Sequence, residues 1–252
     1  MASVLPWRTG VLIAGLSALA AGAHAQVRWT VDAKSSLAWW QLNPHMDHLW
    51  ATTCPGEPSW RSGGGRSTTW LMNRWRGAPT VFDTVNVPLY PRPAARDVCA
   101  EAVRGEIVAP DTATWRGVRG VVVVKPDLLF SGNQQRDTHM RDAILETKQH
   151  PEIRFTIDSL VNATRQADTL SGSAVGIFSL HGVNRPMVAT IRMWADAEGL
   201  RVVGKFWMPA KAMVEEYGLS SKALGLGVGV RVWKDLFMGV DLLLRSQGSA
   251  DN

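Results

Sequence analysis

Apolar and polar residues alternate along much of the second half of the chain. Four consecutive segments show this pattern, and each is roughly ten residues long: EIRFTIDSLV, LSGSAVGIFSLHG, PMVATIRMWA and LRVVGKFWM. Period-two alternation bounded by polar turns is typical of β-strands. Because these segments follow one another at short spacing, the pattern predicts an antiparallel meander or barrel.

The same pattern extends to both sides of this region. Further strands are predicted at residues 27–31, 37–41, 115–124, 127–130, 224–233 and 235–245. The last of these is apolar on both faces, with Leu236 and Met238 on one face and Phe237 and Leu243 on the other. A sheet with one face in water would alternate more cleanly, so a barrel with an apolar interior and a partly covered exterior is favoured.

Two segments have helical rather than β spacing. Residues 136–148 combine a few apolar positions with many charges and precede Pro151, which predicts a short amphipathic helix. Residues 208–223 have Pro209 near their start and Gly218 near their stop, which predicts a second helix.

Periodicity is lost between residues 43 and 104. This stretch contains CPGEP, SGGGR and VPLYPRP, and seven of the twelve tryptophans lie between Trp29 and Trp75. The stretch also holds both cysteines, Cys54 and Cys99. It is therefore interpreted as a long insertion at 43–104 pinned by a structural disulfide. Its tryptophans suit two roles, either as packing anchors of a loop-rich segment or as an aromatic lid for an apolar ligand.

The first 25 residues have the features of a secretory signal. Arg8 precedes an apolar stretch at 11–21, and Ala23 and Ala25 provide small residues for cleavage before Gln26. No later segment has the apolar length of a transmembrane helix. The expected organisation is a cleaved signal peptide at 1–25, a barrel domain at 26–246 and a flexible tail at 247–252, with a periplasmic or secreted location.

Charge gives little indication of a macromolecular partner. The formal net charge is +5, and removal of the signal peptide with its single arginine lowers it to +4. Basic residues are scattered rather than gathered in a run, so nucleic-acid binding is not expected. The mild positive balance suits either ordinary solubilising charge or weak attraction to anionic lipids.

Candidate chemistry is sparse along the chain. His45, Asp47 and His48 form a compact cluster without an evident third strong ligand, so no metal site is expected there. Asp137 and His139 are the best acid/base pair, but no serine or cysteine has a recognisable nucleophile context. An enzyme is therefore not the leading hypothesis, and no catalytic residue is assigned.

Two separated motifs resemble those of the YceI-like family. They are GNQQRDTHMR, near the predicted first helix, and HGVNRP, where a predicted strand ends. The opening WTVDAKSS resembles the family's first strand more weakly. The positions that carry the resemblance are Arg136, Asp137, His139, Arg141, His181 and Pro186. The insertion at 43–104 is a departure from the family pattern.

The resemblance implies a lipocalin-like antiparallel barrel in the bacterial periplasm. It also implies a binding role, with a long isoprenoid chain such as a quinone or polyprenyl phosphate held in an apolar tunnel. The complete expectation is an all-β, extended antiparallel lipocalin-like β-barrel with one or two short helices and a long disulfide-bridged insertion. The family gives none of the motif residues a catalytic role.

These lines together predict an exported carrier for a long apolar or amphiphilic ligand. The expected tunnel lining consists of Trp39, Phe155, Ile157, Phe178, Leu180, Ile191, Met193, Phe206, Met208 and Phe237. No cofactor is required beyond a bound polyisoprenoid or quinone-like lipid. Two alternatives are a lipid-directed enzyme and a module that docks on a membrane redox or lipid-handling complex through 43–104. A homodimer is left open.

Overall fold

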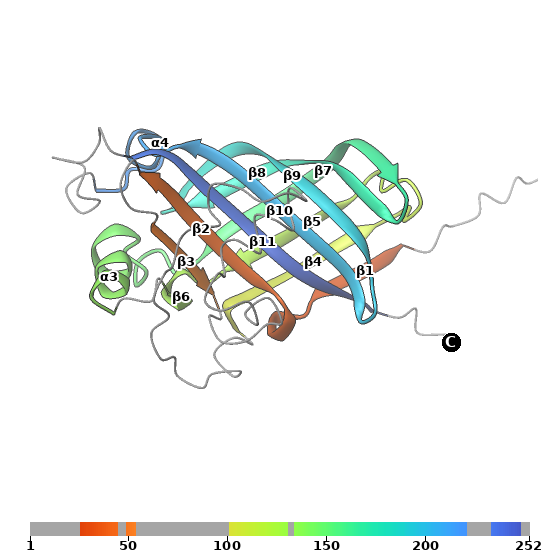
Figure 1. Cartoon of the computed structure of the whole chain (residues 1–252), viewed down its shortest axis with the longest axis horizontal. Helices are drawn as coiled ribbons and strands as arrows, with labels where there is room; N and C mark the ends of the chain where they lie inside the picture. The colour runs from red at the N-terminus through yellow and green to blue at the C-terminus, as the bar shows by residue number, and fades with distance from the viewer. Residues whose placement is uncertain (1–25, 45–48, 54–100, 131–133, 221–232, 248–252) are drawn as a thin grey trace, which may run out of the picture.

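A single antiparallel sheet of eleven strands dominates the computed structural model, which describes residues 26–44, 49–53, 101–130, 134–220 and 233–247. The sheet curls into an elongated barrel (Figure 1). Its strands are β1 (Val27–Val31), β2 (Leu37–Pro44), β3 (Leu49–Thr53), β4 (Val103–Ala109), β5 (Arg119–Val124), β6 (Leu129–Phe130), β7 (Ile153–Gln166), β8 (Thr169–Leu180), β9 (Val183–Asp196), β10 (Gly199–Pro209) and β11 (Trp233–Gln247). The predicted all-β antiparallel barrel is therefore confirmed.

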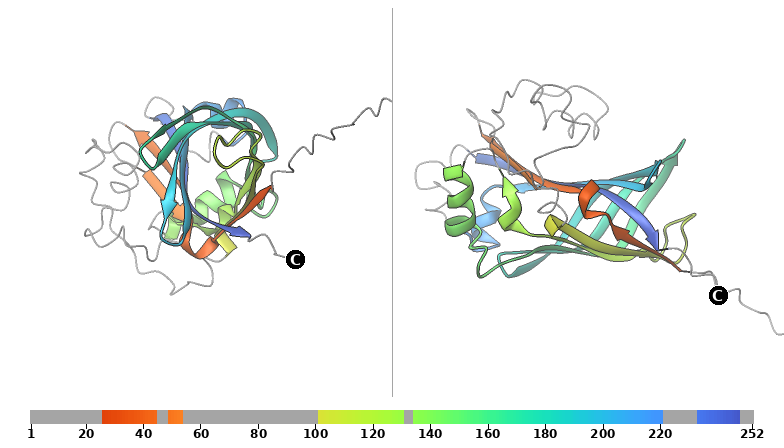
Figure 2. Two further views of the ribbon diagram at one scale, coloured as in Figure 1. Left: turned by 90° about the vertical axis from the view of Figure 1, so that its right-hand side faces the viewer. Right: turned by 90° about the horizontal axis from the view of Figure 1, so that it is seen from below.

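Strand β1 closes the barrel because it pairs on both of its edges. One edge pairs with β4 and the other with the end of β11, where Val31 lies opposite Leu244. The closed ring follows the order β1, β4, β5, β7, β8, β9, β10 and β11. An end-on view shows this ring (Figure 2, left). A closed ring of eight strands leaves no free edge and has an interior wide enough for side chains or one small ligand.

A short kink separates β1 from β2. The 3₁₀ turn η1 (Ala33–Ser35) follows Asp32, whose side chain accepts a hydrogen bond from the Lys34 amide at 3.1 Å. After the kink, β2 also pairs with β11. On its other edge β2 pairs with β3, and β3 in turn pairs with β6. The wall of the barrel thus changes strands along its length, from β1, β4 and β5 to β2, β3 and β6.

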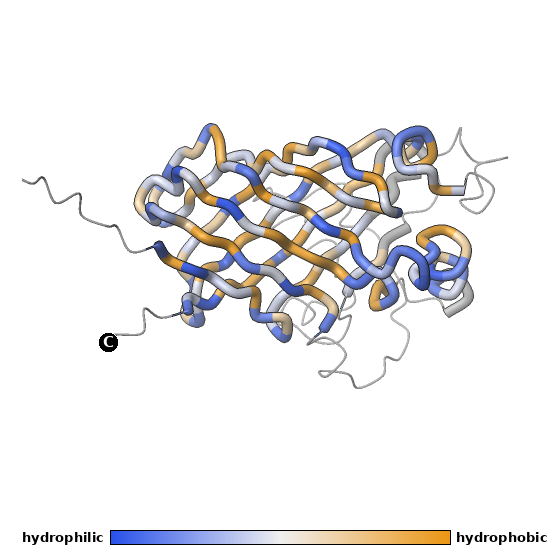
Figure 3. Tube along the Cα trace, turned by 180° about the vertical axis from the view of Figure 1, so that it is seen from behind, coloured by the Kyte–Doolittle hydropathy of each residue, from blue (hydrophilic) through white to orange (hydrophobic). Residues whose placement is uncertain are grey.

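Strands β7 to β10 form consecutive hairpins, as the alternating pattern predicted. Along β8, buried and half-buried residues alternate without interruption, which places one set inside the barrel. The hydropathy of the chain alternates in the same way along the wall (Figure 3). A Cβ on Gly176 would lie 1.9 Å from the Thr156 carbonyl oxygen, so only glycine permits this approach of β8 to β7.

Short helices gather at one end of the barrel (Figure 1). Helix α3 (Gln134–His139) continues into the π-helical turn η5 (Met140–Ile144), close to the predicted helix at 136–148. The second predicted helix is reduced to the single turn α4 (Ala212–Glu215). Gly218 follows shortly after this turn and has the left-handed φ of +68° that is common after a helix C-terminus.

Two local expectations differ from the structure. Residues 43–104 were interpreted as one long insertion without strong periodicity, yet β3 lies inside this stretch and β4 begins at its end. The first two residues of the predicted strand at 127–130 belong to the 3₁₀ turn η4 (Pro126–Leu128), and only the last two form β6. Such short strands exist because a neighbouring strand pairs with them, and their own sequences are too short to show periodicity.

Several expectations fall outside the described residues. They concern the signal peptide at 1–25, the cluster of His45, Asp47 and His48, the disulfide between Cys54 and Cys99, and nearly all of the predicted strand at 224–233. Most of the tail at 247–252 lies outside as well. Among the residues that the structure describes, no helix is long and apolar enough to cross a membrane.

Candidate ligand-binding cavity

The interior of the barrel contains two clusters of buried apolar residues. The first includes Ile107 on β4, Val122 on β5 and Leu244 on β11, together with residues of β8, β9 and β10. The second lies against the helices and includes Met140 and Leu219. Neither cluster fills the barrel completely, and a cavity extends through both of them.

This cavity has a volume of about 350 Å³ and is almost entirely apolar. Every strand of the ring except β1 contributes to it, together with β2, β6, α3, η5, the segment that follows η5, and α4. The lining residues are Ala38, Trp39, Trp40, Ile107, Val122, Val124, Leu129, His139, Met140, Ile144, Leu145, Ile153, Arg154, Phe155, Ile157, Ala174, Phe178, Leu180, Ala189, Ile191, Val202, Gly204, Lys205, Phe206, Met213, Leu236, Met238, Gly239, Val240 and Leu242. Its volume and apolar lining are those of a small-molecule site.

Seven of the ten residues expected in the tunnel border this cavity: Trp39, Phe155, Ile157, Phe178, Leu180, Ile191 and Phe206. Met193 and Met208 belong to the two buried clusters but do not border the cavity. Phe237 does not line it either. Its neighbours Leu236 and Met238 both line the cavity, so alternation along β11 turns Phe237 to the outer face. That position differs from the expectation.

Small residues that were not among the predicted lining residues hold the cavity open. Ala174 and Ala189 lie opposite each other on β8 and β9, and Gly204 follows on β10. All three border the cavity at points where a larger side chain would fill it. The signal was present in the strand pattern, since each occupies the same face as the predicted lining residues Phe178, Ile191 and Phe206.

Only three of the thirty lining residues have side chains that carry or can take up a positive charge. They are His139 at the end of α3, Arg154 near the start of β7, and Lys205 on β10. Arg154 donates a hydrogen bond to Glu152 at 2.7 Å, which holds the pKa of the Glu152 carboxyl below its ordinary value. Two of these three groups, His139 and Arg154, belong to the segments around the helical end of the barrel.

Aromatic rings pack around the helical end of the cavity. Phe178 contacts Phe206 edge-on, with ring centroids 4.8 Å apart, and Tyr217 at 5.8 Å. Tyr217 is only 1% exposed, and its hydroxyl has no hydrogen-bond partner in the part of the chain that the structure describes. Burial raises the pKa of Tyr217 to about 12. Leu145 and Leu180 complete this end of the cavity from η5's C-terminal side and from β8.

The residues that carry the family motif are spread over this same end. Asp137 is fully buried, whereas His139 is exposed on the same helix and borders the cavity. The Arg141 guanidinium lies 6.0 Å from the centre of the Phe130 ring. His181 occupies the turn between β8 and β9, and Pro186 is exposed on β9. Arg136 lies in α3, and its side chain is not among those described.

A closed antiparallel barrel around an apolar cavity defines the lipocalin-like class of ligand-binding folds. The family model of the YceI-like domain matches residues 98–238. The chain therefore belongs to the YceI-like family. The match includes both motifs that the sequence analysis identified, whereas β1 and β2 lie outside it.

Solved structures are similar to this chain at low sequence identity. BcnA of Burkholderia cenocepacia matches with a TM-score of 0.54 and 7% identity, over 85% of this chain and 99% of that chain. A polyisoprenoid-binding domain from Saccharophagus degradans, implicated in plant cell wall breakdown, has a TM-score of 0.47 and 14% identity, over 86% and 97%. The YceI protein of Campylobacter jejuni has a TM-score of 0.43 and 16% identity, over 59% and 83%. No curated protein matches the sequence.

Proposed function

We propose that this protein is an exported carrier that binds a long apolar or amphiphilic molecule inside its barrel. A polyisoprenoid or quinone-like lipid suits the shape and chemistry best. The observation that carries the proposal is the cavity of about 350 Å³, which the described side chains leave unfilled along the barrel axis. Membership of the YceI-like family supports a binding role rather than a catalytic one.

The energetic cost of such a cavity supports the same function. Protein interiors are normally packed to the density of organic crystals. Apolar cavity volume costs roughly 24 cal/mol per Å³, so 350 Å³ corresponds to about 8 kcal/mol, which is comparable with the whole stability of a domain. The small residues Ala174, Ala189 and Gly204 keep this space open at that cost, which is recovered when an apolar ligand fills it.

An apolar chain in this cavity gains enough free energy for useful affinity. Each buried methylene contributes about 0.8 kcal/mol, so ten of them contribute about 8 kcal/mol before the costs of ordering. A polar head is best placed at the helical end, where His139 borders the cavity. An imidazole N–H can donate a hydrogen bond to an anionic or carbonyl-bearing head.

Native mass spectrometry of the protein from its own host, followed by solvent extraction, tests the proposal directly. We expect a co-purifying isoprenoid or quinone species that is released by organic solvent. Protein freed of lipid should then bind a ubiquinone or polyprenyl phosphate with a stoichiometry of one, measured by quenching of tryptophan fluorescence. Protein that carries no lipid and binds neither probe would exclude the carrier function.

A pair of neighbouring variants locates the binding site. Ala189→Phe adds a ring on the inner face of β9, whereas Val188→Phe adds the same ring at a position that is 55% exposed on the outer face. We expect the first to weaken lipid binding at least about tenfold, because it occupies the volume that the ligand needs. The second should bind like the wild type. Equal lipid affinity in both variants would show that the ligand binds outside the barrel.

The alternatives predict different outcomes of the same experiments. An enzyme would convert the bound lipid to a product, and its activity would depend on Asp137 and His139. A docking module would bind its membrane partner through 43–104 and would do so equally well with the Ala189→Phe barrel. Export is tested by the N-terminus of the mature protein, which is expected at Gln26.

A further inference from the structure

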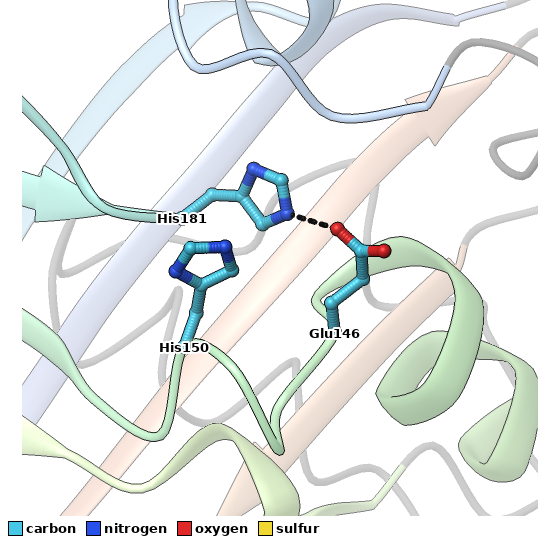
Figure 4. A group of neighbouring side chains, drawn as sticks. All are labelled: Glu146, His150 and His181. Carbon is cyan, nitrogen blue, oxygen red and sulfur yellow. Dashed lines mark hydrogen bonds and ion pairs between the residues drawn. The ribbon is translucent and has the colours of Figure 1, made fainter.

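Three side chains that could bind a metal lie together at the helical end of the barrel (Figure 4). Glu146 follows η5, His150 precedes β7, and His181 occupies the turn between β8 and β9. Their closest ligand atoms all lie within 4.8 Å of one another. The two imidazole rings also pack against each other, with centroids 4.1 Å apart. No metal ligand is expected from the sequence, because nothing in the spacing of these residues brings them together.

The surroundings of His181 place a hydrogen-bond acceptor beside each of its two ring nitrogens. Its Nδ1 lies 3.2 Å from the backbone carbonyl oxygen of Tyr217, and its Nε2 lies 2.7 Å from a carboxylate oxygen of Glu146. Both partners only accept hydrogen bonds, and a neutral imidazole has a single N–H to donate. If Nδ1 donates to Tyr217, the lone pair of Nε2 faces the carboxylate. In that tautomer the Nε2 lone pair is available to a metal ion.

We propose that Glu146, His150 and His181 form a binding site for a divalent transition-metal ion, with zinc as the best-matched ion. Two imidazoles and one carboxylate are a common zinc donor set, and their intermediate softness excludes calcium and magnesium as preferred ions. The hydrogen bond from Nδ1 of His181 to a backbone carbonyl is the usual support of a metal-binding histidine, since it directs Nε2 to the ion.

The geometry requires only small movements to accept the ion. Ligand atoms around tetrahedral zinc lie about 3.4 Å apart. The pair at 2.7 Å therefore opens by about 0.7 Å, and atoms at the outer limit of 4.8 Å approach by about 1.4 Å. The side chain of His181 is 13% exposed and that of Glu146 is 40% exposed. An ion can thus enter from solvent, and water can supply a fourth ligand.

A bound ion would tie together three segments that close the cavity. Leu145 and Leu180 border the cavity and directly precede Glu146 and His181. His181 in turn holds the backbone of Tyr217 beyond α4. The ion is therefore expected to oppose opening of the helical end and to slow ligand exchange. This consequence rests on the proposed carrier function, whereas the metal site itself does not.

Titration of chelator-treated protein with Zn²⁺, followed by isothermal calorimetry, tests the site. Glu146→Gln, His150→Phe and His181→Asn each remove one ligand, and we expect each to weaken zinc binding at least about tenfold. His150→Phe keeps an aromatic ring against His181, and asparagine tolerates the left-handed φ of +52° at position 181. Glu215→Gln, a change at an exposed carboxylate on α4, is the matched control and should bind like the wild type.

Two outcomes would overturn the proposal. One is a wild-type protein that does not bind zinc at all. The other is unchanged zinc affinity in all three variants, which would show that the ion binds elsewhere, for instance at His45 and His48. Anomalous scattering from zinc-soaked wild-type crystals locates the ion even if the variants fold poorly. Lipid binding is measured separately on zinc-free protein, so failure of the metal site is distinguishable from failure of the carrier function.

Discussion

The two ends of this barrel are built in different ways. At one end, which we call the ladder end, β1 completes the wall of the ring through backbone hydrogen bonds with β4 and with the last part of β11. At the other, the helical end, α3, η5 and α4 close the cavity with side chains from short helices and turns. A backbone ladder opens only by breaking many hydrogen bonds together, whereas side-chain contacts of short segments separate in local steps. The helical end is therefore the expected route for a ligand.

The largest expected effect comes from alanine substitutions at two glycines, one at each end of the barrel. A Cβ on Gly120 in β5 would lie 2.5 Å from the Glu106 carbonyl oxygen, so Gly120→Ala forces β4 and β5 apart. We expect the free energy of unfolding to fall by about 3 kcal/mol or more. At the helical end Gly218 has open space around its Cβ position and only the backbone strain of φ +68°. Gly218→Ala should cost about 1–2 kcal/mol. Urea denaturation measures both values, and equal costs would contradict the comparison.

Native-state hydrogen exchange provides the second test. The amide of Asp32, which donates to Leu243 at 2.8 Å, belongs to the ladder end. The amides of Glu216 and Leu219 donate within the turn around α4. We expect the two amides near α4 to exchange about a hundredfold faster, because that turn opens without global unfolding. If all three amides exchange at the rate set by global unfolding, the helical end is no more labile than the ladder.

The third test concerns pH and the buried Tyr217. Its pKa is raised by burial to about 12, above the ordinary value of 10.0. Because the folded state binds this proton more tightly, the stabilisation is complete below pH 10 and is lost as the pH rises from about 10 to about 12. The loss amounts to about 2–3 kcal/mol. Urea denaturation between pH 8 and pH 12 measures it.

Tyr217→Phe is the control for this pH dependence. The variant should lack the decline assigned to Tyr217 above pH 10. It should be as stable as the wild type near pH 8, or slightly more stable, because it removes a buried hydroxyl without a hydrogen-bond partner among the described residues. A decline of the same size in the variant would assign the pH dependence to other groups.

The smallest effect is expected at an exposed ion pair of the ladder end. Arg28 on β1 and Glu106 on β4 form this pair, and their side chains are 51% and 38% exposed. Exposed pairs contribute little, so Arg28→Gln should change the free energy of unfolding by no more than about 0.5 kcal/mol. A loss of several kcal/mol would show that side-chain charge, rather than the backbone ladder, stabilises this end of the barrel.

Local pattern was sufficient to predict the central strands of the fold. The alternation from Ile153 to Pro209 predicted four hairpin-connected strands, and the structure contains β7 to β10 there. These strands are long, and each has one buried face, so every second residue carries information about the core. The same alternation identified Phe155, Phe178 and Phe206 as inward-facing, and all three border the cavity.

The short strands and the side-chain cluster could not be predicted in this way. β6 has two residues, and its conformation depends on pairing with β3 from a distant part of the chain. Glu146, His150 and His181 meet only because the barrel brings the end of β8 against the segment before β7. Contacts between distant segments follow from the closed ring and leave no periodic trace in the sequence.

The orientation of Phe237 also could not be predicted from the sequence pattern. The sequence of β11 is apolar on both faces, so its pattern does not distinguish inside from outside. The pairing of β11 with β10 decides the question, since Trp207 lies opposite Phe237 and is 57% exposed. Register with a neighbouring strand thus determines which of two apolar faces meets the ligand.

By itself, the sequence determined the antiparallel β-strands, the apolar interior and the resemblance to the YceI-like family, because these depend on local alternation and on short motifs. Only the tertiary structure decided how the ring closes, where small residues leave the cavity unfilled, and which charged side chains meet at its helical end. Those features depend on strand register and ring closure, which bring together residues that are far apart in the chain.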